Sequence, residues 1–190
     1  MYSCVWHSIP GVKRIIISKS RFNEFEISSN LSKLEEISNS FNRDLEIMIR
    51  FTPGIECHTH EYIRTGSFDS KFGFGIEYLN TLFQRISNTK HLKLNGLHAH
   101  IGSQIFELEP HKDLGEIMVS VILDAKKYGH YIEKLNVGGG LGIKYVEDDD
   151  PPSIDEWVRT ISTSVLKACN KHNLDLPTLM CEPGRSIVST

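Results

Sequence analysis

The order of its apolar segments constrains the fold of this chain most strongly. Short, buried-looking strand candidates alternate with longer segments that carry apolar residues at helical spacing. The strand candidates are Arg14–Ser18, Leu45–Phe51, Leu92–Ile101, Lys134–Val137 and Leu179–Cys181. The helical candidates are 29–42, 76–86, 111–128 and 153–172. Strand-helix-strand repeats predict right-handed crossovers and a parallel sheet. A doubly wound sheet and a (β/α)8 barrel remain open.

Length and charge narrow the function classes. The chain has 190 residues, which suits one ordinary domain. It contains 21 Lys and Arg and 24 Asp and Glu, which gives a net charge of −3. Because a nucleic-acid-binding domain usually carries a clustered basic face, we expect no nucleic-acid binding. No apolar run approaches the roughly 20 residues that a membrane helix needs, and no secretory signal is visible. We therefore expect a cytoplasmic protein, with Cys4, Cys57, Cys169 and Cys181 as reduced thiols.

Polar and glycine residues gather where the predicted strands end. Arg50 ends the second strand, and the segment 98–104 (His-Ala-His-Ile-Gly-Ser-Gln) ends the third. Gly138–Gly140 follows the fourth strand, and Glu182–Arg185 follows the fifth. Ligands bind at the carboxyl ends of parallel strands, so we expect one shared site at that edge.

The glycine run admits two interpretations. Consecutive glycines let backbone N–H groups approach an anion closely, which suits a phosphate. The run Gly138-Gly139-Gly140-Leu141-Gly142 matches neither the dinucleotide-binding nor the Walker A pattern. A tight turn with no ligand explains the same residues.

Three interpretations of His98 and His100 stay open. On a strand, residues two apart share a face, so both imidazoles could enter the same site. They could bind a metal, although Glu182 is the one further ligand at the predicted strand ends. They could be packed core histidines. One could also stack on a flat cofactor ring while Ser103 offers a hydroxyl to a phosphate. A second pair, His58 and His60, falls in a polar loop and is expected to be exposed.

The segment Glu182-Pro183-Gly184-Arg185 admits two interpretations. A carboxylate can hold a protonated pyridine nitrogen, and the Arg185 guanidinium can grip a phosphate or a carboxylate in a bidentate fork. The alternative is a surface turn with an ion pair.

Several motifs together resemble the pyridoxal-phosphate decarboxylases of the alanine-racemase-like fold. They are RFTPGIE (50–56), HTHEYIRTG (58–66), SKFG (70–73), GLHAHIGSQ (96–104), NVGGGLG (136–142) and CEPGR (181–185). They appear in the family's order, and the Thr-His-Glu-Tyr and Gly-Ser-Gln elements favour its diaminopimelate branch. The resemblance covers residues from about 12 to the end of the chain.

The resemblance implies a role for each matching residue. His100 stacks on the ring of pyridoxal 5′-phosphate, Glu182 pairs with the pyridine nitrogen, and Arg50 supports the cofactor from a neighbouring strand. Arg185 also reaches a substrate carboxylate, and Lys71 receives no chemical role. The phosphate-binding residues would be Ser103, Gly138, Gly139, Gly140, Gly184 and Arg185.

The implied activity is the decarboxylation of meso-diaminopimelate to L-lysine and CO2 by a homodimer. The family's Schiff-base lysine segment and its C-terminal β domain have no counterpart here. We therefore expect residues 12–190 to be a partial barrel domain with about five strands, and residues 1–11 stay unassigned. The alternatives are a metal-dependent barrel hydrolase that uses His98 and His100, and a non-catalytic remnant that binds a cofactor.

Overall fold

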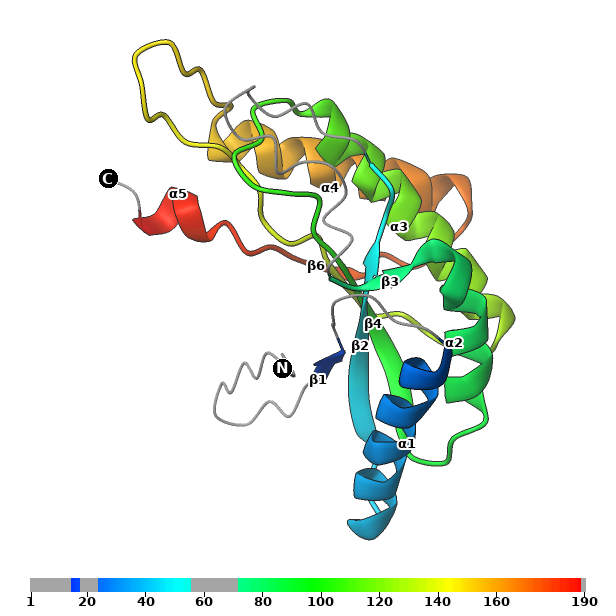
Figure 1. Cartoon of the computed structure of the whole chain (residues 1–190). Helices are drawn as coiled ribbons and strands as arrows, with labels where there is room; N and C mark the ends of the chain where they lie inside the picture. The colour runs from blue at the N-terminus through cyan, green and yellow to red at the C-terminus, as the bar shows by residue number, and fades with distance from the viewer. Residues whose placement is uncertain (1–14, 18–23, 56–71, 189–190) are drawn as a thin grey trace.

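The computed structural model describes residues 15–17, 24–55 and 72–188, with strands and helices alternating along them (Figure 1). The strands are β1 (Ile15–Ile17), β2 (Leu45–Thr52), β3 (Phe74–Gly75), β4 (Leu92–Ala99), β5 (Lys134–Asn136) and β6 (Thr178–Met180). The helices are α1 (Glu24–Ser40), α2 (Leu79–Ser87), α3 (Glu109–Lys127), α4 (Ile154–Lys171) and α5 (Gly184–Val188), and a 3-10 turn (Ile76–Tyr78) precedes α2.

The strand order decides between the two open architectures. The strands pair in parallel in the order β1-β2-β4-β5-β6, and the short β3 pairs with β2 off this path. A doubly wound sheet reverses its strand order at a switch point, whereas this order follows the chain throughout. Right-handed crossovers then place the connecting helices on one side, as Figure 1 shows for α1 to α4. The chain therefore carries part of an α/β barrel, as predicted.

Most element boundaries agree with the expectation to within a few residues. The predicted capping box of α4 is present: the Ser153 hydroxyl accepts from the Glu156 N–H, and the Glu156 carboxylate accepts from the Ser153 N–H at 2.9 Å. The first helix begins at Glu24 rather than at 29, and β3 and α5 were not predicted. A two-residue strand and a five-residue helix are too short to show a periodic pattern.

The helix-facing side of the sheet forms the apolar core. On β2, the buried residues Ile47, Ile49 and Phe51 face this core, where Phe83 of α2 and Trp157 of α4 are fully buried. Burying a side chain of this size stabilises the fold by about 1.5–3 kcal/mol. The core thus fixes the sheet, and the sheet in turn fixes the positions at which its strands end.

An irregularity in β4 turns His98 away from this core. Ile47 pairs with Leu94, and Ile49 pairs with Leu97. Between these two pairs β4 advances by three residues and β2 by two, so the register shifts at this point. Because side chains alternate between faces, one extra residue moves every following side chain to the opposite face. His98 therefore shares a register level with Arg50 of β2 on the face opposite the helices.

Candidate functional site

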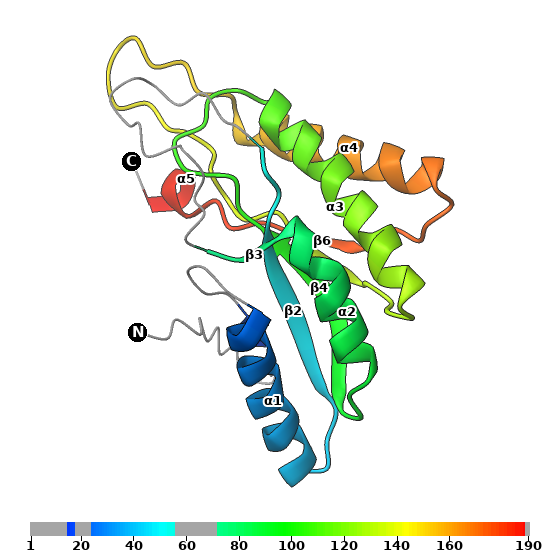
Figure 2. The ribbon, with the colours of Figure 1, turned by 45° about the vertical axis from the view of Figure 1, so that its right-hand side comes forward.

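The structure brings the predicted site residues together at the carboxyl ends of β2, β4, β5 and β6. Arg50, His98 and Asn136 pair across three neighbouring strands and thus form one row of side chains. His100 follows β4, the three glycines follow β5, and the segment from Glu182 to Arg185 follows β6. Figure 2 shows β4, β6 and α5 converging at this end of the sheet. Their roles in binding remain predictions.

The glycine turn is packed too tightly for any side chain. A Cβ added at Gly138 would lie 2.7 Å from His100 Nδ1, and one at Gly140 would lie 2.8 Å from the Gly102 carbonyl oxygen. A Cβ at Gly139 would collide with the Glu182 carbonyl oxygen. Gly138 and Gly140 also have φ values of 66° and 110°, a region that glycine occupies without strain. Glycine is therefore required at all three positions.

Two amides of this turn already have acceptors inside the protein. The Gly138 N–H donates to Asn136 Oδ1 at 2.9 Å, and the Gly139 N–H donates to His100 Nδ1 at 3.2 Å. Among the described residues, no acceptor within the protein is found for the Gly140 N–H. The first two glycines therefore shape the turn and position their neighbours.

The hydrogen bond from the Gly139 N–H indicates which tautomer His100 adopts. Because Nδ1 accepts a hydrogen bond, it carries no proton, and the proton of the neutral ring lies on Nε2. The imidazole is thus fixed against the glycine turn, at the mouth of the site.

Glu182 is tied to the same turn from the other side. Its N–H donates to the Gly138 carbonyl oxygen at 2.7 Å, and its Oε1 accepts from Asn136 Nδ2 at 2.7 Å. The residue is nevertheless exposed, so its carboxylate can reach a ligand. The Gly184 N–H turns back to the Glu182 carbonyl oxygen at 2.8 Å.

Arg185 and Ser103 meet across the site. Arg185 Nη2 donates to Ser103 Oγ at 3.0 Å, and its Nη1 contacts the Tyr145 hydroxyl. The guanidinium lies over the Tyr145 ring, 5.6 Å from its centroid. A cation and a hydroxyl side by side suit a phosphate.

Gln104 holds the loop that carries Tyr145. Its buried amide donates to the Ile143 carbonyl oxygen at 2.6 Å and accepts from the Ile143 N–H at 3.2 Å. This two-point contact fixes the loop against the end of β4, so Gln104 has a structural role.

His98 lies below these groups and is uncharged. It is 5% exposed, and neither ring nitrogen finds a hydrogen-bond partner among the described residues. Burial, and to a smaller extent the neighbouring positive charge of Arg50, lower the pKa of His98 to about 4. The Arg50 guanidinium also lies over the Phe72 ring, 5.2 Å from its centroid.

A metal site gains no support from this arrangement. Across residues 15–17, 24–55 and 72–188, no three side chains of His, Cys, Asp or Glu come together as metal ligands. His58, His60 and Lys71 lie outside the described residues, as do residues 1–11.

No helix in the described ranges is both long and apolar enough to cross a membrane.

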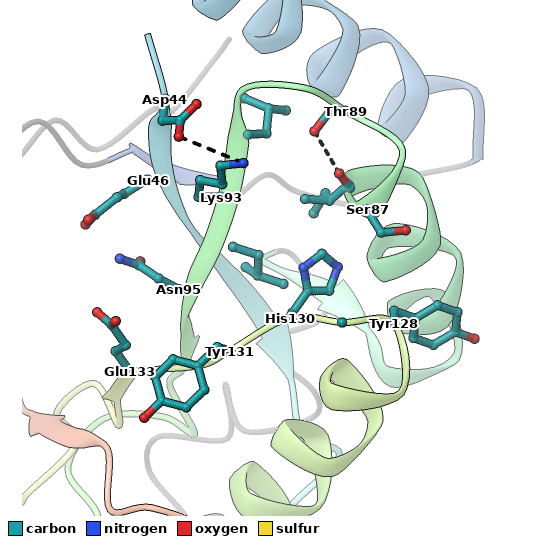
Figure 3. Close-up of a pocket in the computed structure, with 14 residues that line it drawn as sticks. Asp44, Glu46, Ser87, Thr89, Lys93, Asn95, Tyr128, His130, Tyr131 and Glu133 are labelled. Atoms are coloured by element: carbon teal, nitrogen blue, oxygen red, sulfur yellow. Dashed lines mark hydrogen bonds and ion pairs between the residues drawn. The ribbon is translucent and has the colours of Figure 1, made fainter.

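A cavity of about 590 Å³ lies at the opposite edge, where the strands begin (Figure 3). Of its charged groups, Asp44 lies 3.9 Å from Lys93 and also accepts a hydrogen bond at 2.9 Å from the neighbouring His91. The hydrogen bond from His91 lowers the pKa of Asp44. This edge of a parallel α/β barrel serves stability, so the cavity is not our candidate site.

Comparisons with known proteins agree on one family. Residues 12–189 match the family described as pyridoxal-dependent decarboxylase, pyridoxal binding domain. A diaminopimelate decarboxylase of Synechocystis is 52% identical over 84% of this chain and 34% of its own length. The Staphylococcus aureus enzyme is 38% identical over 85% of this chain and 38% of its own. The chain therefore spans little more than a third of the curated relatives it matches.

Solved structures show the same similarity. A diaminopimelate decarboxylase of M. jannaschii in complex with L-lysine superimposes with a TM-score of 0.76 at 28% identity, over 94% of this chain and 39% of the other. The Helicobacter pylori enzyme, also with L-lysine, has a TM-score of 0.71 at 30% identity, over 85% and 39%.

Sequence reasoning missed the roles of Asn136 and Tyr145. Asn136 carried a signal, since a polar residue that ends a buried strand next to a glycine run is unusual. Tyr145 carried none, because its position depends on the path of a loop.

Proposed function

The chain belongs to the pyridoxal-dependent decarboxylases, and from this premise we propose that the carboxyl edge of its sheet holds pyridoxal 5′-phosphate in an enzyme that converts meso-diaminopimelate to L-lysine and CO2. The observation that carries the proposal is the meeting of an exposed carboxylate, Glu182, with a glycine turn and an Arg185–Ser103 pair. The similarity to the Synechocystis enzyme supports the choice of substrate.

The residues present fit this cofactor. The tight packing of the turn at Gly138–Gly140 places His100 and the backbone of Glu182 directly beside it, so groups that suit a ring and a phosphate lie together. Arg185 and Ser103 supply a charge and a hydroxyl for the phosphate. The carboxylate of Glu182 suits a protonated ring nitrogen, and the neutral ring of His100 suits stacking.

Each of these groups has a task in the reaction. When bound, the cofactor supplies a ring that accepts the electrons left behind by CO2. Glu182 holds a proton at the ring nitrogen, and Arg185 and Ser103 anchor the phosphate. His100 fixes the plane of the ring, and Arg50 lends positive charge from β2. Arg185 is also proposed to contact a substrate carboxylate.

Two finer properties belong to the proposal. The family resemblance supports a homodimer, which light scattering tests. Cys169 and Cys181 are free thiols, which suits the reducing cytoplasm, and cell fractionation tests this location.

A chimera tests the proposed activity. Residues 12–189 replace the matching segment of the Synechocystis relative, and CO2 release from meso-diaminopimelate is measured with pyridoxal phosphate. We expect release above the cofactor blank and its loss in the Glu182→Gln chimera. A folded chimera that binds the cofactor without releasing CO2 would instead favour a non-catalytic remnant.

A further inference from the structure

Asn136 stands in one row with Arg50 and His98 and is almost fully buried. It ends β5, directly before the glycine turn, and is 2% exposed. None of the roles proposed above uses it. A fully buried amide must satisfy both its donor and its acceptor inside the protein, since an unmet polar group costs about 1–3 kcal/mol.

Both ends of this amide are engaged by cofactor-binding groups. Nδ2 donates to Glu182 Oε1 at 2.7 Å, and Oδ1 accepts from the Gly138 N–H at 2.9 Å. The Glu182 N–H also donates to the Gly138 carbonyl oxygen at 2.7 Å. Glu182, Asn136 and Gly138 thus close a ring of three hydrogen bonds.

The chemistry of this ring requires asparagine. An aspartate could accept from Gly138, but it would set a second carboxylate against Glu182. A leucine of similar size could neither donate nor accept. Asparagine is the residue of this shape that accepts at one end and donates at the other.

Asn136 joins the Glu182 carboxylate directly to the glycine turn. In the row across the sheet, His98 follows Asn136 and Arg50 follows His98. Neither nitrogen of His98 forms a hydrogen bond within the described residues. His100 accepts from Gly139, and Lys134, two residues earlier on β5, donates to Glu46.

We propose that Asn136 is a positioning residue that holds the Glu182 carboxylate at a fixed place relative to the glycine turn, so that one ligand is gripped at its ring nitrogen and its phosphate together. This inference rests on the proposed function, because it assumes that Glu182 and the turn bind the same cofactor.

The test compares two probes on the 190-residue chain by titration calorimetry. Pyridoxine 5′-phosphate presents ring and phosphate but has no aldehyde to react with lysines. Inorganic phosphate reports on the proposed phosphate-binding groups alone, which are the glycine turn, Ser103 and Arg185. The variants are Asn136→Asp, which keeps the acceptor for Gly138, and Asn136→Leu, which keeps neither bond and buries no charge. Asn170→Asp, at an exposed position on α4, makes the same chemical change away from the site.

Asn136→Asp is expected to lower the affinity for pyridoxine phosphate about tenfold or more, because one charge-assisted hydrogen bond is lost. It is expected to lower the affinity for inorganic phosphate less than about threefold. Asn136→Leu is expected to weaken both probes, and Asn170→Asp neither. The two carboxylates of Asn136→Asp share a proton at low pH, so its loss of affinity shrinks as the pH falls. A purely structural role would not produce that pH dependence.

The outcomes separate the inference from the proposed function. If the unchanged chain binds neither probe, the proposed function fails and the inference fails with it. If the unchanged chain binds both probes, and both Asn136→Asp and Asn136→Leu bind them as tightly as the unchanged chain does, the inference alone is overturned. If Asn136→Asp does not fold, unchanged binding of pyridoxine phosphate by Asn136→Leu still overturns it.

Discussion

The two edges of the sheet use their charged residues in opposite ways. Where the strands begin, acids and bases pair with one another: Asp44 with His91, and Glu46 with Lys134 at 3.1 Å. Where the strands end, Glu182 and Arg185 bond to neutral groups of the protein, an amide, a serine and a tyrosine. Their charges therefore stay available to a ligand.

We therefore base the choice of candidate site on the arrangement of charges and not on the size of a cavity. The cavity in Figure 3 lies at the edge where Asp44 and Glu46 already have partners of opposite charge. At the carboxyl edge, the buried Asn136 holds the exposed Glu182, and Ser103 and Tyr145 hold Arg185, in each case without neutralising the charge. Preorganised charges of this kind are what ligand binding and catalysis require.

The largest expected effect is the loss of the exposed carboxylate. Glu182→Gln in the chimera should lower CO2 release by about a hundredfold or more, because proton control at the ring nitrogen is lost. Glu133→Gln makes the same change beside the cavity and should leave the rate within twofold. Equal losses in the two variants would erase the distinction between the edges.

Glycines at the two edges should respond differently to an added methyl group. The methyl group of Gly139→Ala would collide with the backbone of Glu182 and displace this residue from its place beside the turn. The affinity for pyridoxine phosphate should therefore fall about tenfold. At Gly129 an added Cβ meets nothing within 4 Å, but φ is +83°, so Gly129→Ala should lower stability by about 1–2 kcal/mol.

Calorimetry and denaturant unfolding on both variants check these two effects. Unchanged binding in Gly139→Ala would show that the packing of the turn does not set the site.

The buried histidines predict how stability depends on pH. Burial lowers the pKa of His98 to about 4, and that of His111, fully buried under the glycine turn, also to about 4. The unfolded chain binds these protons near pH 6.5, so unfolding takes up protons between pH 6.5 and about 4. Stability is full above that window and falls as the pH falls through it, by about 1 kcal/mol per pH unit for each histidine.

Urea unfolding measured across this window checks the slope. His98→Leu should reduce it, and a slope that stays unchanged would mean that His98 is charged in the folded protein.

The smallest effect is expected at the paired edge. Glu46→Gln removes the partner of Lys134, but half of the Glu46 side chain is exposed, so stability should change by less than about 1 kcal/mol. Binding of pyridoxine phosphate should not change. A large loss of binding would show that the two edges are coupled through β2.

The sequence predicted the fold because its signals were local. Ser153 and Glu156 form the expected cap, and the strand candidates at Leu45 and Leu92 begin where predicted. The side of the sheet that His98 faces could not be predicted from alternation alone. It depends on the irregularity between Leu94 and Leu97, which is visible only in the pairing with β2.

The sequence allowed the residues at the strand ends to be predicted as site candidates, but not the residues that hold them in place. Glu182 and Arg185 could be proposed from the sequence because their residue types suggest chemistry, and the structure places both near the ends of the strands. Asn136, Gln104 and Tyr145 act through contacts with residues many positions away, as between Asn136 and Glu182 or Gln104 and Ile143. Such contacts depend on how the loops pack.

The most direct test of this account follows backbone amide shifts while the chain is titrated with pyridoxine 5′-phosphate. We predict saturable shifts at His100, Gly140 and Gly184, at the carboxyl edge of the sheet. Asp44, Lys93 and Gly129 around the cavity should not shift. Shifts centred on the cavity residues, or none at either edge, would contradict the assignment of the cofactor site.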